Sequence, residues 1–332
     1  MIIQKNCNIG TVLLLLFEMT DADNNTILNS TNHFQEPWKE LDVENGDKRI
    51  DIFISENVVD ISRRQTQAMV LDGTVLVNGR RVKKNFMVQT GDRILILNSP
   101  VPKKWNVKPS TLNNLDIIYS DPAFIVINKP SKIPSTAKNP DDTSSIASMI
   151  TARFPECSGI GNTGDGGLIH RLDTETSGLL IAARDTKTYD IFLQMQKSSH
   201  IKKYYKALVH GSFDTPVIFD MPLDTNEKNR RKVTVNLKGN KSVTHILDAE
   251  QHGAYSLLNV LIYKGFRHQI RVHLANDGFP ICGDTLYNSS AKEGLERLFL
   301  HAFSLEFYHP HTGKELKLST ELPKELILHL NS

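Results

Sequence analysis

An aspartate flanked by glycine and hydroxyl side chains is the feature of this sequence best suited to chemistry. Asp173 lies in the stretch HRLDTETSG, residues 170–178, and five glycines lie between residues 159 and 167. A carboxylate in such a setting can serve as a nucleophile or as a general base. The same residue types also form side-chain-to-backbone turns, and no Gly-Lys-Ser or Gly-Lys-Thr completes a phosphate loop. The local pattern alone therefore favours a structural turn over a catalytic group.

The elements that must position this aspartate are mostly short strands. Asp185 can cap a helix that runs to about Lys197. Many strands with few helices between them indicate an α+β domain on a mostly antiparallel mixed sheet, which we expect over residues 113–330, rather than a doubly wound fold. Alternating or β-rich runs that predict strands occupy residues 115–119, 124–128, 179–183, 203–210, 232–235, 257–263 and 303–307.

A series of motifs in fixed order surrounds Asp173. His170-Arg171-Leu172-Asp173, two variable residues and then Thr176-Ser177-Gly178-Leu179-Leu180 resemble the signature of the RluA-type pseudouridine synthases, the group that acts on large-subunit ribosomal RNA. With the small module described below, the resemblance spans about residues 48–320. The other stretches that resemble this family are residues 125–130 (INKP turn), 205–211, 268–274 (HQIRVHL), 280–284, 300–302, 309–310 and 312–313.

The resemblance implies a reaction and assigns roles to three residues. The family isomerises uridine in RNA to its carbon-linked isomer and needs no cofactor or metal. Asp173 would be the central group, either attacking the anomeric carbon or abstracting a sugar proton, and the sequence leaves both routes open. Arg271 would be the cation that keeps this carboxylate ionised, and Tyr205 would stack under the target uracil. We expect the target base to flip out of its stem, with Arg171 filling the vacated stack or binding a neighbouring phosphate.

One stretch departs from the family pattern. The family more often has Gly-Arg-Thr before His-Gln-Ile-Arg, whereas this chain has Gly265-Phe266-Arg267. On a strand, a shift of one position turns a side chain to the opposite face. We therefore expect that Arg267 does not replace the family's arginine.

Residues 46–98 predict a small, basic α/β RNA-binding module. A capping box at Ser62 and Gln65 opens a helix through Leu71, and Asn78-Gly79 predicts a hairpin. The order of residues 49–51, 62–63 and 72–79 resembles the RNA-binding module named after the fourth protein of the small ribosomal subunit. Residues 61–84 contain six basic residues and one acid, a net charge of +5, and we expect RNA contacts from Arg63, Arg64, Arg80, Arg81, Lys83 and Lys84.

The remaining segments are an acidic N-terminus and a linker. Residues 1–45 carry seven acids against two lysines and lack a sustained period, which predicts poor order. Met19 is an alternative translation start. The apolar run at residues 12–17 is too short to span a membrane. Residues 99–112, with three prolines and three lysines, predict an extended linker.

Composition bounds the class of protein. The chain has 332 residues, 39% hydrophobic and 23% charged, and three widely spaced cysteines without metal-ligand spacing. We therefore expect a cytoplasmic protein, and we expect it to be a monomer. The resemblance to the RNA-modifying family implies ribosomal RNA as the partner, with transfer RNA as a second possibility. The main alternative is a non-catalytic RNA-binding assembly factor. A third class is a glycoside hydrolase. Such an enzyme would require a second carboxylate paired with Asp173, and the sequence shows no obvious one.

Overall fold

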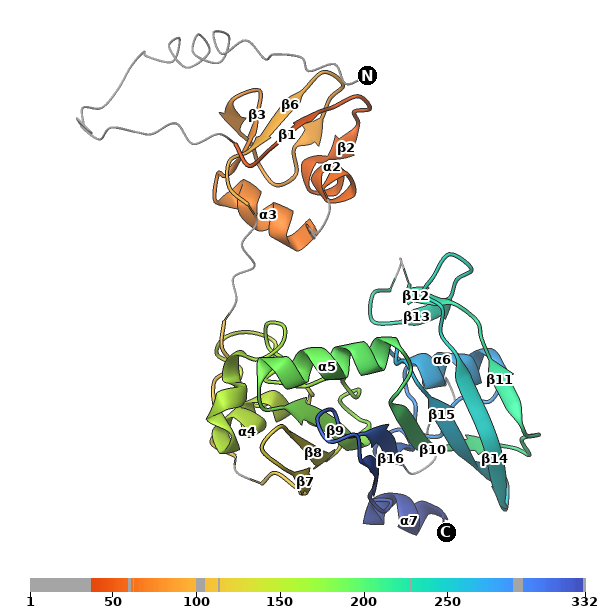
Figure 1. The fold of residues 1–332 in the computed structure, drawn as a ribbon. Coiled ribbons are helices and arrows are strands. Elements are labelled where there is room, and N and C mark those ends of the chain that lie inside the picture. The colour runs from red at the N-terminus through yellow and green to blue at the C-terminus, as the bar shows by residue number, and fades with distance from the viewer. Residues whose placement is uncertain are drawn as a thin grey trace, which may run out of the picture. The chain divides into compact units, whose positions relative to one another are not determined.

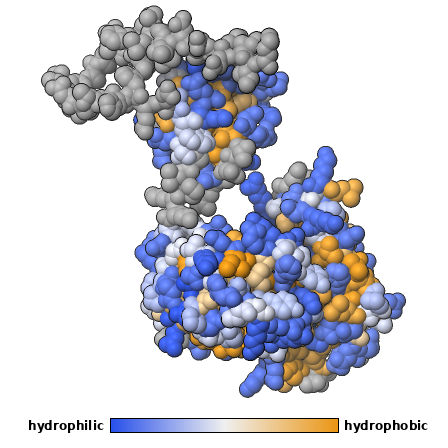
Figure 2. Space-filling model, viewed as in Figure 1, coloured by the Kyte–Doolittle hydropathy of each residue, from blue (hydrophilic) through white to orange (hydrophobic). Residues whose placement is uncertain are grey.

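The computed structural model describes residues 37–58, 61, 63–99, 105–112, 114–226, 229–288 and 295–330. The chain divides into two compact units, the first ending at Lys103 and the second beginning at Lys104 (Figure 1). Hydrophilic residues cover much of the visible face of each unit (Figure 2). No helix within the described ranges is long and apolar enough to cross a membrane.

The first unit combines a four-stranded sheet with two helices. Its sheet has the order β1-β6-β3-β4, and β2 pairs separately with β5. The predicted hairpin is present, with positive φ angles at both Asn78 and Gly79. The helix predicted through Leu71 is present too, although Ser62 lies outside the described residues. The elements are β1 (Lys39–Asp42), β2 (Lys48–Arg49), α2 (Ile50–Asn57), α3 (Arg63–Leu71), β3 (Val75–Val77), β4 (Arg80–Arg81), β5 (Met87–Val88) and β6 (Arg93–Ile96).

The predicted lack of order over residues 1–45 is wrong for the end of that segment. Residues 39–42 form β1, which pairs antiparallel with β6. Leu41 and the buried Val43 pack against the core of the first unit. Backbone pairing at a sheet edge needs few apolar side chains, so the acidic composition concealed this strand. Residues 1–36, which include Met19 and the apolar run, lie outside the described residues.

The second unit is built on one large mixed sheet. Its order is β11-β14-β15-β10-β16-β9-β8-β7, with β17 beside β16. Among the strands that the structure describes, only β9 and β16 pair in parallel, in agreement with the predicted α+β domain on a mostly antiparallel sheet. The strands are β7 (Ile117–Ser120), β8 (Phe124–Lys129), β9 (Ser177–Ala183), β10 (Lys202–His210), β11 (Val217–Phe219), β12 (Leu223–Thr225), β13 (Val233–Val235), β14 (Thr244–His252), β15 (Tyr255–Ile262), β16 (Leu300–Tyr308) and β17 (Glu315–Ser319).

Helices and two hydrophobic clusters cover this sheet. Ile125 and Ile127 of β8 pack in one cluster with α4, while Phe124 and Val126 pack in another with α5. Because successive residues of a strand point to opposite faces, β8 is buried on both faces. Asp185 caps α5 as predicted, accepting from the amide of Thr188. The helices are α4 (Ile146–Arg153), η1 (Pro155–Gly159), α5 (Thr186–Lys197), α6 (Gln269–Asn276) and α7 (Lys324–Leu330).

The predicted linker is only partly a linker. Trp105 packs against the core of the second unit, and Val107 is 2% exposed. The amide of Val107 donates to Ser158, and that of Ser110 donates to Ser148. Residues 105–110 are therefore integral to the second unit, because their apolar side chains reach its core. Residues 100–104 lie outside the described residues.

Candidate active site

The loop that carries Asp173 is fixed by hydrogen bonds on both sides of the aspartate. The hydroxyl of the buried Ser135 donates to the carbonyl of Leu172 (2.7 Å) and accepts from the amide of Leu172 (3.0 Å). The amide of Thr176 donates to the Asp173 carbonyl (3.1 Å), which closes a turn. The side chain of Asp173 itself is 23% exposed. The turn and the presented carboxylate are thus one structure.

Gly178 lets this loop enter the sheet directly beside another strand. Its φ is +116°, and a Cβ there would lie 2.2 Å from the carbonyl oxygen of Ala302 on β16. No other residue fits such a close backbone approach. Gly178 and Ala302 are paired residues of β9 and β16, which run parallel. The glycine therefore sets how closely the loop after Asp173 joins the sheet.

Lys129 holds the loop that carries Asp173 through its fully buried ammonium group, which donates to three backbone carbonyls. Its Nζ donates to the carbonyls of Pro130 (2.7 Å), Ile133 (2.8 Å) and Thr174 (3.0 Å). Burial lowers the pKa of Lys129 to about 7; the charge of Arg297 acts in the same direction, and the Asp173 carboxylate opposes both. The contact with Thr174 ties the residue after Asp173 to the Asn-Lys-Pro turn.

We expect Lys129→Met to change how the stability of the second unit depends on pH. The folded pKa of Lys129 is about 7, below the ordinary value of about 10.4. Between these values the unfolded chain binds one more proton than the folded chain, so the free energy of unfolding rises with pH. Lys129→Met removes this rise, which is at most about 1.4 kcal/mol per pH unit. Urea denaturation near about pH 7 and about pH 9.5 measures it.

The second unit can be followed separately in the full chain. The chain has two tryptophans, Trp38 and Trp105, so a Trp38→Phe background leaves only the fluorophore of the second unit. The exposed Lys138 provides a matched control, and Lys138→Met should keep the wild-type pH dependence. An equal pH dependence in Lys129→Met and wild type would contradict the lowered pKa.

Arg271 of α6 joins two carboxylates. Its Nη1 donates to Asp173 Oδ2 (2.8 Å), so the predicted ion pair is present. Its Nε and Nη2 donate to the two oxygens of Asp284 (2.6 and 2.7 Å), whose side chain is 0% exposed. Burial acts against the charge, yet Asp284 and then Asp173 raise the pKa of Arg271. A bidentate pair of this kind fixes the guanidinium plane and hence the direction of Nη1.

Only one oxygen of the Asp173 carboxylate is engaged. Among the described residues, the hydrogen bond from Arg271 and the approach of His268 both end on Oδ2. Oδ1 has no such partner there and belongs to a side chain that is partly exposed. The geometry leaves Oδ1 available to a molecule that enters the site.

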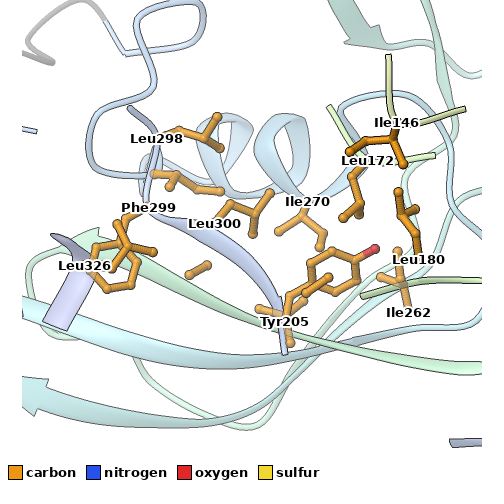
Figure 3. Packing of buried hydrophobic residues seen from close by; sticks show 14 of the residues in the cluster. Ile146, Leu172, Leu180, Tyr205, Ile262, Ile270, Leu298, Phe299, Leu300 and Leu326 are labelled. Carbon is orange, nitrogen blue, oxygen red and sulfur yellow. The ribbon is translucent and has the colours of Figure 1, made fainter. Parts of the chain in front are cut away.

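Tyr205 lies at the floor of the site on β10. Its ring is 5% exposed and lies among Leu172, Leu180 and Ile270, with the hydroxyl directed to the side where Leu172 and Leu180 lie (Figure 3). The pairing with β16 shifts register between Tyr204 and Tyr205, a bulge that re-aims side chains. Burial and the nearby Asp173 charge raise the pKa of Tyr205, which keeps the phenol protonated.

Arg267 does not lie on a strand, contrary to the expectation. It precedes α6 in a loop, where Nη2 donates to the carbonyls of Arg230 (2.6 Å) and Lys232 (3.2 Å). The segment bends here because α6 begins at Gln269. The argument from strand faces therefore fails, and Arg267 holds the basic turn between β12 and β13. Arg171, two residues before Asp173, is exposed.

The cations predicted to bind RNA in the first unit are not equivalent. Arg63 is 43% exposed but donates to Asp51, whose side chain is buried (3.2 Å). It thus helps to hold α3 against α2 as well as presenting charge. The side chain of Arg64 lies outside the described residues. The other four cations are exposed on β4 and the turn after it, Arg80, Arg81, Lys83 and Lys84.

Sequence reasoning assigned no role to four residues at the site. Asp284 and Lys129 lie in stretches that matched the family, and these matches were the available signals. His268 also opens a matching stretch, residues 268–274, but its approach to Asp173 was not predicted. Nothing local marked Tyr287, whose contact with His268 arises only in the folded chain. No group of three His, Cys, Asp or Glu side chains in the described ranges could hold a metal ion.

Comparison with known families agrees with this fold. Residues 123–276 match the family described as RNA pseudouridylate synthase, and residues 48–94 match the S4 domain. The chain belongs to the RNA pseudouridine synthase family and carries an S4 RNA-binding domain. It is an RNA-modifying isomerase, and the non-catalytic alternative is disfavoured.

Particular relatives resemble most of the chain. An RNA pseudouridine synthase of Bacillus subtilis, named YlyB and described as uncharacterized, is 33% identical over 285 residues, 85% of this chain and 93% of its own. Ribosomal large subunit pseudouridine synthase D of Yersinia pestis is 27% identical over 300 residues, 86% of this chain and 90% of its own. The solved structure of human RNA pseudouridylate synthase domain containing 4 covers 65% of this chain and 92% of its own, at 23% identity and a TM-score of 0.50, and shares the fold.

Proposed function

We propose that this protein converts specific uridines of large-subunit ribosomal RNA to pseudouridine, with Asp173 as the central catalytic group. The observation that carries the proposal is the Asp173 carboxylate, with Oδ2 fixed by Arg271 at 2.8 Å and Oδ1 left to the substrate. The choice of RNA is supported by the relative named as a ribosomal large subunit enzyme. Transfer RNA is the second candidate substrate.

A deletion strain tests the substrate. Pseudouridines are mapped across ribosomal and transfer RNA from the wild-type strain, the deletion strain, and the deletion strain carrying Asp173→Asn. The proposal expects one or more large-subunit positions to lose modification in the second and third strains. Loss confined to transfer RNA would reject ribosomal RNA as the substrate while leaving the reaction intact.

The reaction breaks the bond between the ribose C1′ and N1 of uracil and joins the same C1′ to C5. The base turns between the two steps, C5 loses its proton and N1 gains one, so no atom enters or leaves the nucleotide overall. Asp173 Oδ1 can add to C1′ as a nucleophile or remove a sugar proton as a base. Arg271 donates to Oδ2 in either route. Both routes need the same fixed Oδ2.

The target uridine must leave its stack before it reaches this carboxylate, at an unstacking cost of a few kcal/mol. Tyr205 provides a buried aromatic face near Asp173 on which uracil can stack. The exposed Arg171 is placed two residues away, where it can occupy the gap left by the base or bind a phosphate.

The first unit supplies further RNA contacts in this proposal. A hollow of about 600 Å³ on this unit is lined by side chains of β3, β4 and the turn that follows. Arg80, Arg81 and Lys83 are among its lining residues and are exposed cations. We therefore assign the phosphate-binding surface to the hairpin β3–β4 more than to Arg63, which is engaged by Asp51.

The triple variant Arg80→Ala, Arg81→Ala, Lys83→Ala should bind RNA less tightly and with a weaker salt dependence. Each lost phosphate contact lowers the slope of log affinity against log salt by about 0.7–0.9, so three contacts lower it by about 2–3. Filter binding of large-subunit ribosomal RNA between about 50 and 200 mM KCl measures the slope. Lys39→Ala, on β1 at the opposite edge of the same sheet, is the control and should leave the slope unchanged. An unchanged slope in the triple variant would remove this surface from the RNA footprint.

Three further assignments complete the proposal. The chain is divided into an N-terminal segment, an RNA-binding module, a linker and a catalytic domain. The thiols of the two described cysteines, Cys157 and Cys282, are both buried, which suits a reducing cytoplasm. We assign the protein to the cytoplasm as a monomer, which light scattering of the purified chain can test.

A further inference from the structure

His268 has an unusual backbone conformation at the catalytic centre. Its φ is +56° and ψ is +18°, in the left-handed region. Residues other than glycine seldom adopt this region, and when they do the strain often accompanies function. His268 occupies the N-cap of α6, yet its side chain makes no capping hydrogen bond. The side chain is instead 14% exposed and faces Asp173.

The hydrogen bonds around His268 favour one position for the proton of the ring. The amide of Val233 donates to the hydroxyl oxygen of Tyr287 (2.7 Å), which leaves the hydroxyl proton free to donate. That hydroxyl lies 2.9 Å from Nδ1 of His268 and can donate to it, with Nδ1 as the acceptor. With Nδ1 as the acceptor, the proton of the neutral ring is on Nε2, which lies 3.8 Å from Asp173 Oδ2. In the opposite tautomer, the lone pair of Nε2 would point at the negatively charged carboxylate of Asp173.

The charged groups that face the ring allow this neutral state. Burial lowers the pKa of His268 below its ordinary value, and Arg271 and Arg267 act in the same direction, while Asp173 and Asp284 oppose them. A neutral imidazole with a proton on Nε2 offers a hydrogen-bond donor without a third positive charge. The ring of Tyr287 also lies against the Arg271 guanidinium, with 5.1 Å between the centroid and Cζ.

We propose that His268 is a positioning residue whose Nε2–H donates to Asp173 Oδ2 when RNA is bound, in the tautomer that Tyr287 sets. Catalytic hydrogen bonds are often long in a free enzyme and shorten in the complex. With Arg271 and His268 both on Oδ2, the carboxylate cannot rotate, and Oδ1 remains directed at the uridine. The inference rests on the proposed role of Asp173.

Two substitutions of His268 distinguish the effect of losing the Nε2–H donor from the effect of disturbing the backbone at this position. Asparagine tolerates the left-handed conformation, but its amide reaches only as far as the position of Nδ1. Glutamine is one methylene longer and can place an N–H near the position of Nε2. Tritium release from large-subunit ribosomal RNA, taken from the deletion strain and labelled at the uracil carbon that forms the new bond, gives kcat and KM.

His268→Asn should lower kcat about 10- to 100-fold, the loss expected for one hydrogen bond to a charged group, with little change in KM. His268→Gln should recover most of this loss. Wild-type kcat in both variants would overturn the proposal. So would equal losses in both with unchanged thermal unfolding, because the restored donor would then have no effect.

A measurement on the free protein tests the tautomer without any activity. In the full chain labelled with ¹⁵N-histidine, the His268 resonances are assigned by their absence from His268→Asn. The proposal expects the neutral Nε2–H tautomer at neutral pH in the wild type. In Tyr287→Phe, the preference for this tautomer should be lost. An Nδ1–H tautomer in the wild type would overturn it, whatever RNA the enzyme modifies. A wild type that is inactive on ribosomal RNA would instead count against the proposed substrate alone.

Discussion

Asp173→Asn should abolish pseudouridine formation while leaving the fold and RNA binding in place. Asparagine has the size of aspartate. The turn closed by the Thr176 amide and the hydrogen bonds between Ser135 and Leu172 should therefore be kept. It cannot act as a nucleophile at C1′ or as a base, and Arg271 then faces a neutral amide. We expect tritium release to fall by about 10³-fold or more, which corresponds to about 4 kcal/mol or more of lost transition-state stabilisation. Single-turnover assays with excess enzyme exclude an effect on product release.

Glu175→Gln is the matched control for this variant. Glu175 lies two residues from Asp173 in the same turn, and its backbone carbonyl, not its side chain, accepts from Arg297. Removing its charge should leave kcat within about twofold, since an exposed or half-buried charge away from the reacting atoms contributes little. If kcat fell by similar factors in Asp173→Asn and Glu175→Gln, the effect would come from the negative charge of the turn. Asp173 would then not be the reacting carboxylate.

Sequence patterns predicted strands well where hairpin or alternation signals were strong, and failed where tertiary packing removed the pattern. The hairpin at Asn78-Gly79 needs left-handed residues, which that dipeptide supplies. Strand β14 was missed because a register shift between Ile246 and Asp248 interrupts its alternation and most of its later residues are exposed. Helix α6 was missed because residues 269–274 are all buried, so no apolar stripe distinguishes one face.

The same distinction applies to the active site. Asp173, Tyr205 and Arg271 belong to stretches with a recognisable order, and the Arg271–Asp173 contact was predicted because a carboxylate in a pocket needs a cation. Asp284 engages two of the three donor nitrogens of Arg271, which no local pattern could show. The interpretation of Arg267 as a strand residue failed for the same reason, since the turn that it holds is formed by residues more than thirty positions earlier.

Arg271→Met should cost both stability and activity. Methionine fills the space of the arginine stem but leaves Asp284, a side chain with 0% exposure, without its cation. Removing one partner of a buried ion pair typically costs about 3–5 kcal/mol of unfolding free energy. Activity should fall by about 10²-fold or more, because one charge-assisted hydrogen bond to Asp173 is lost and the carboxylate becomes free to rotate. Urea denaturation followed by Trp105 in the Trp38→Phe background and single-turnover tritium release measure the two losses.

A second substitution separates the two roles of Arg271. In the double variant Arg271→Met, Asp284→Asn the buried position no longer carries a charge that can remain unpaired, so part of the lost stability should return. Activity should stay low, because Asp173 still lacks the Nη1 donor at 2.8 Å. Recovery of activity together with stability would show that Arg271 acts only by satisfying Asp284. Recovery of stability alone would establish that one guanidinium serves the fold through Asp284 and the chemistry through Asp173.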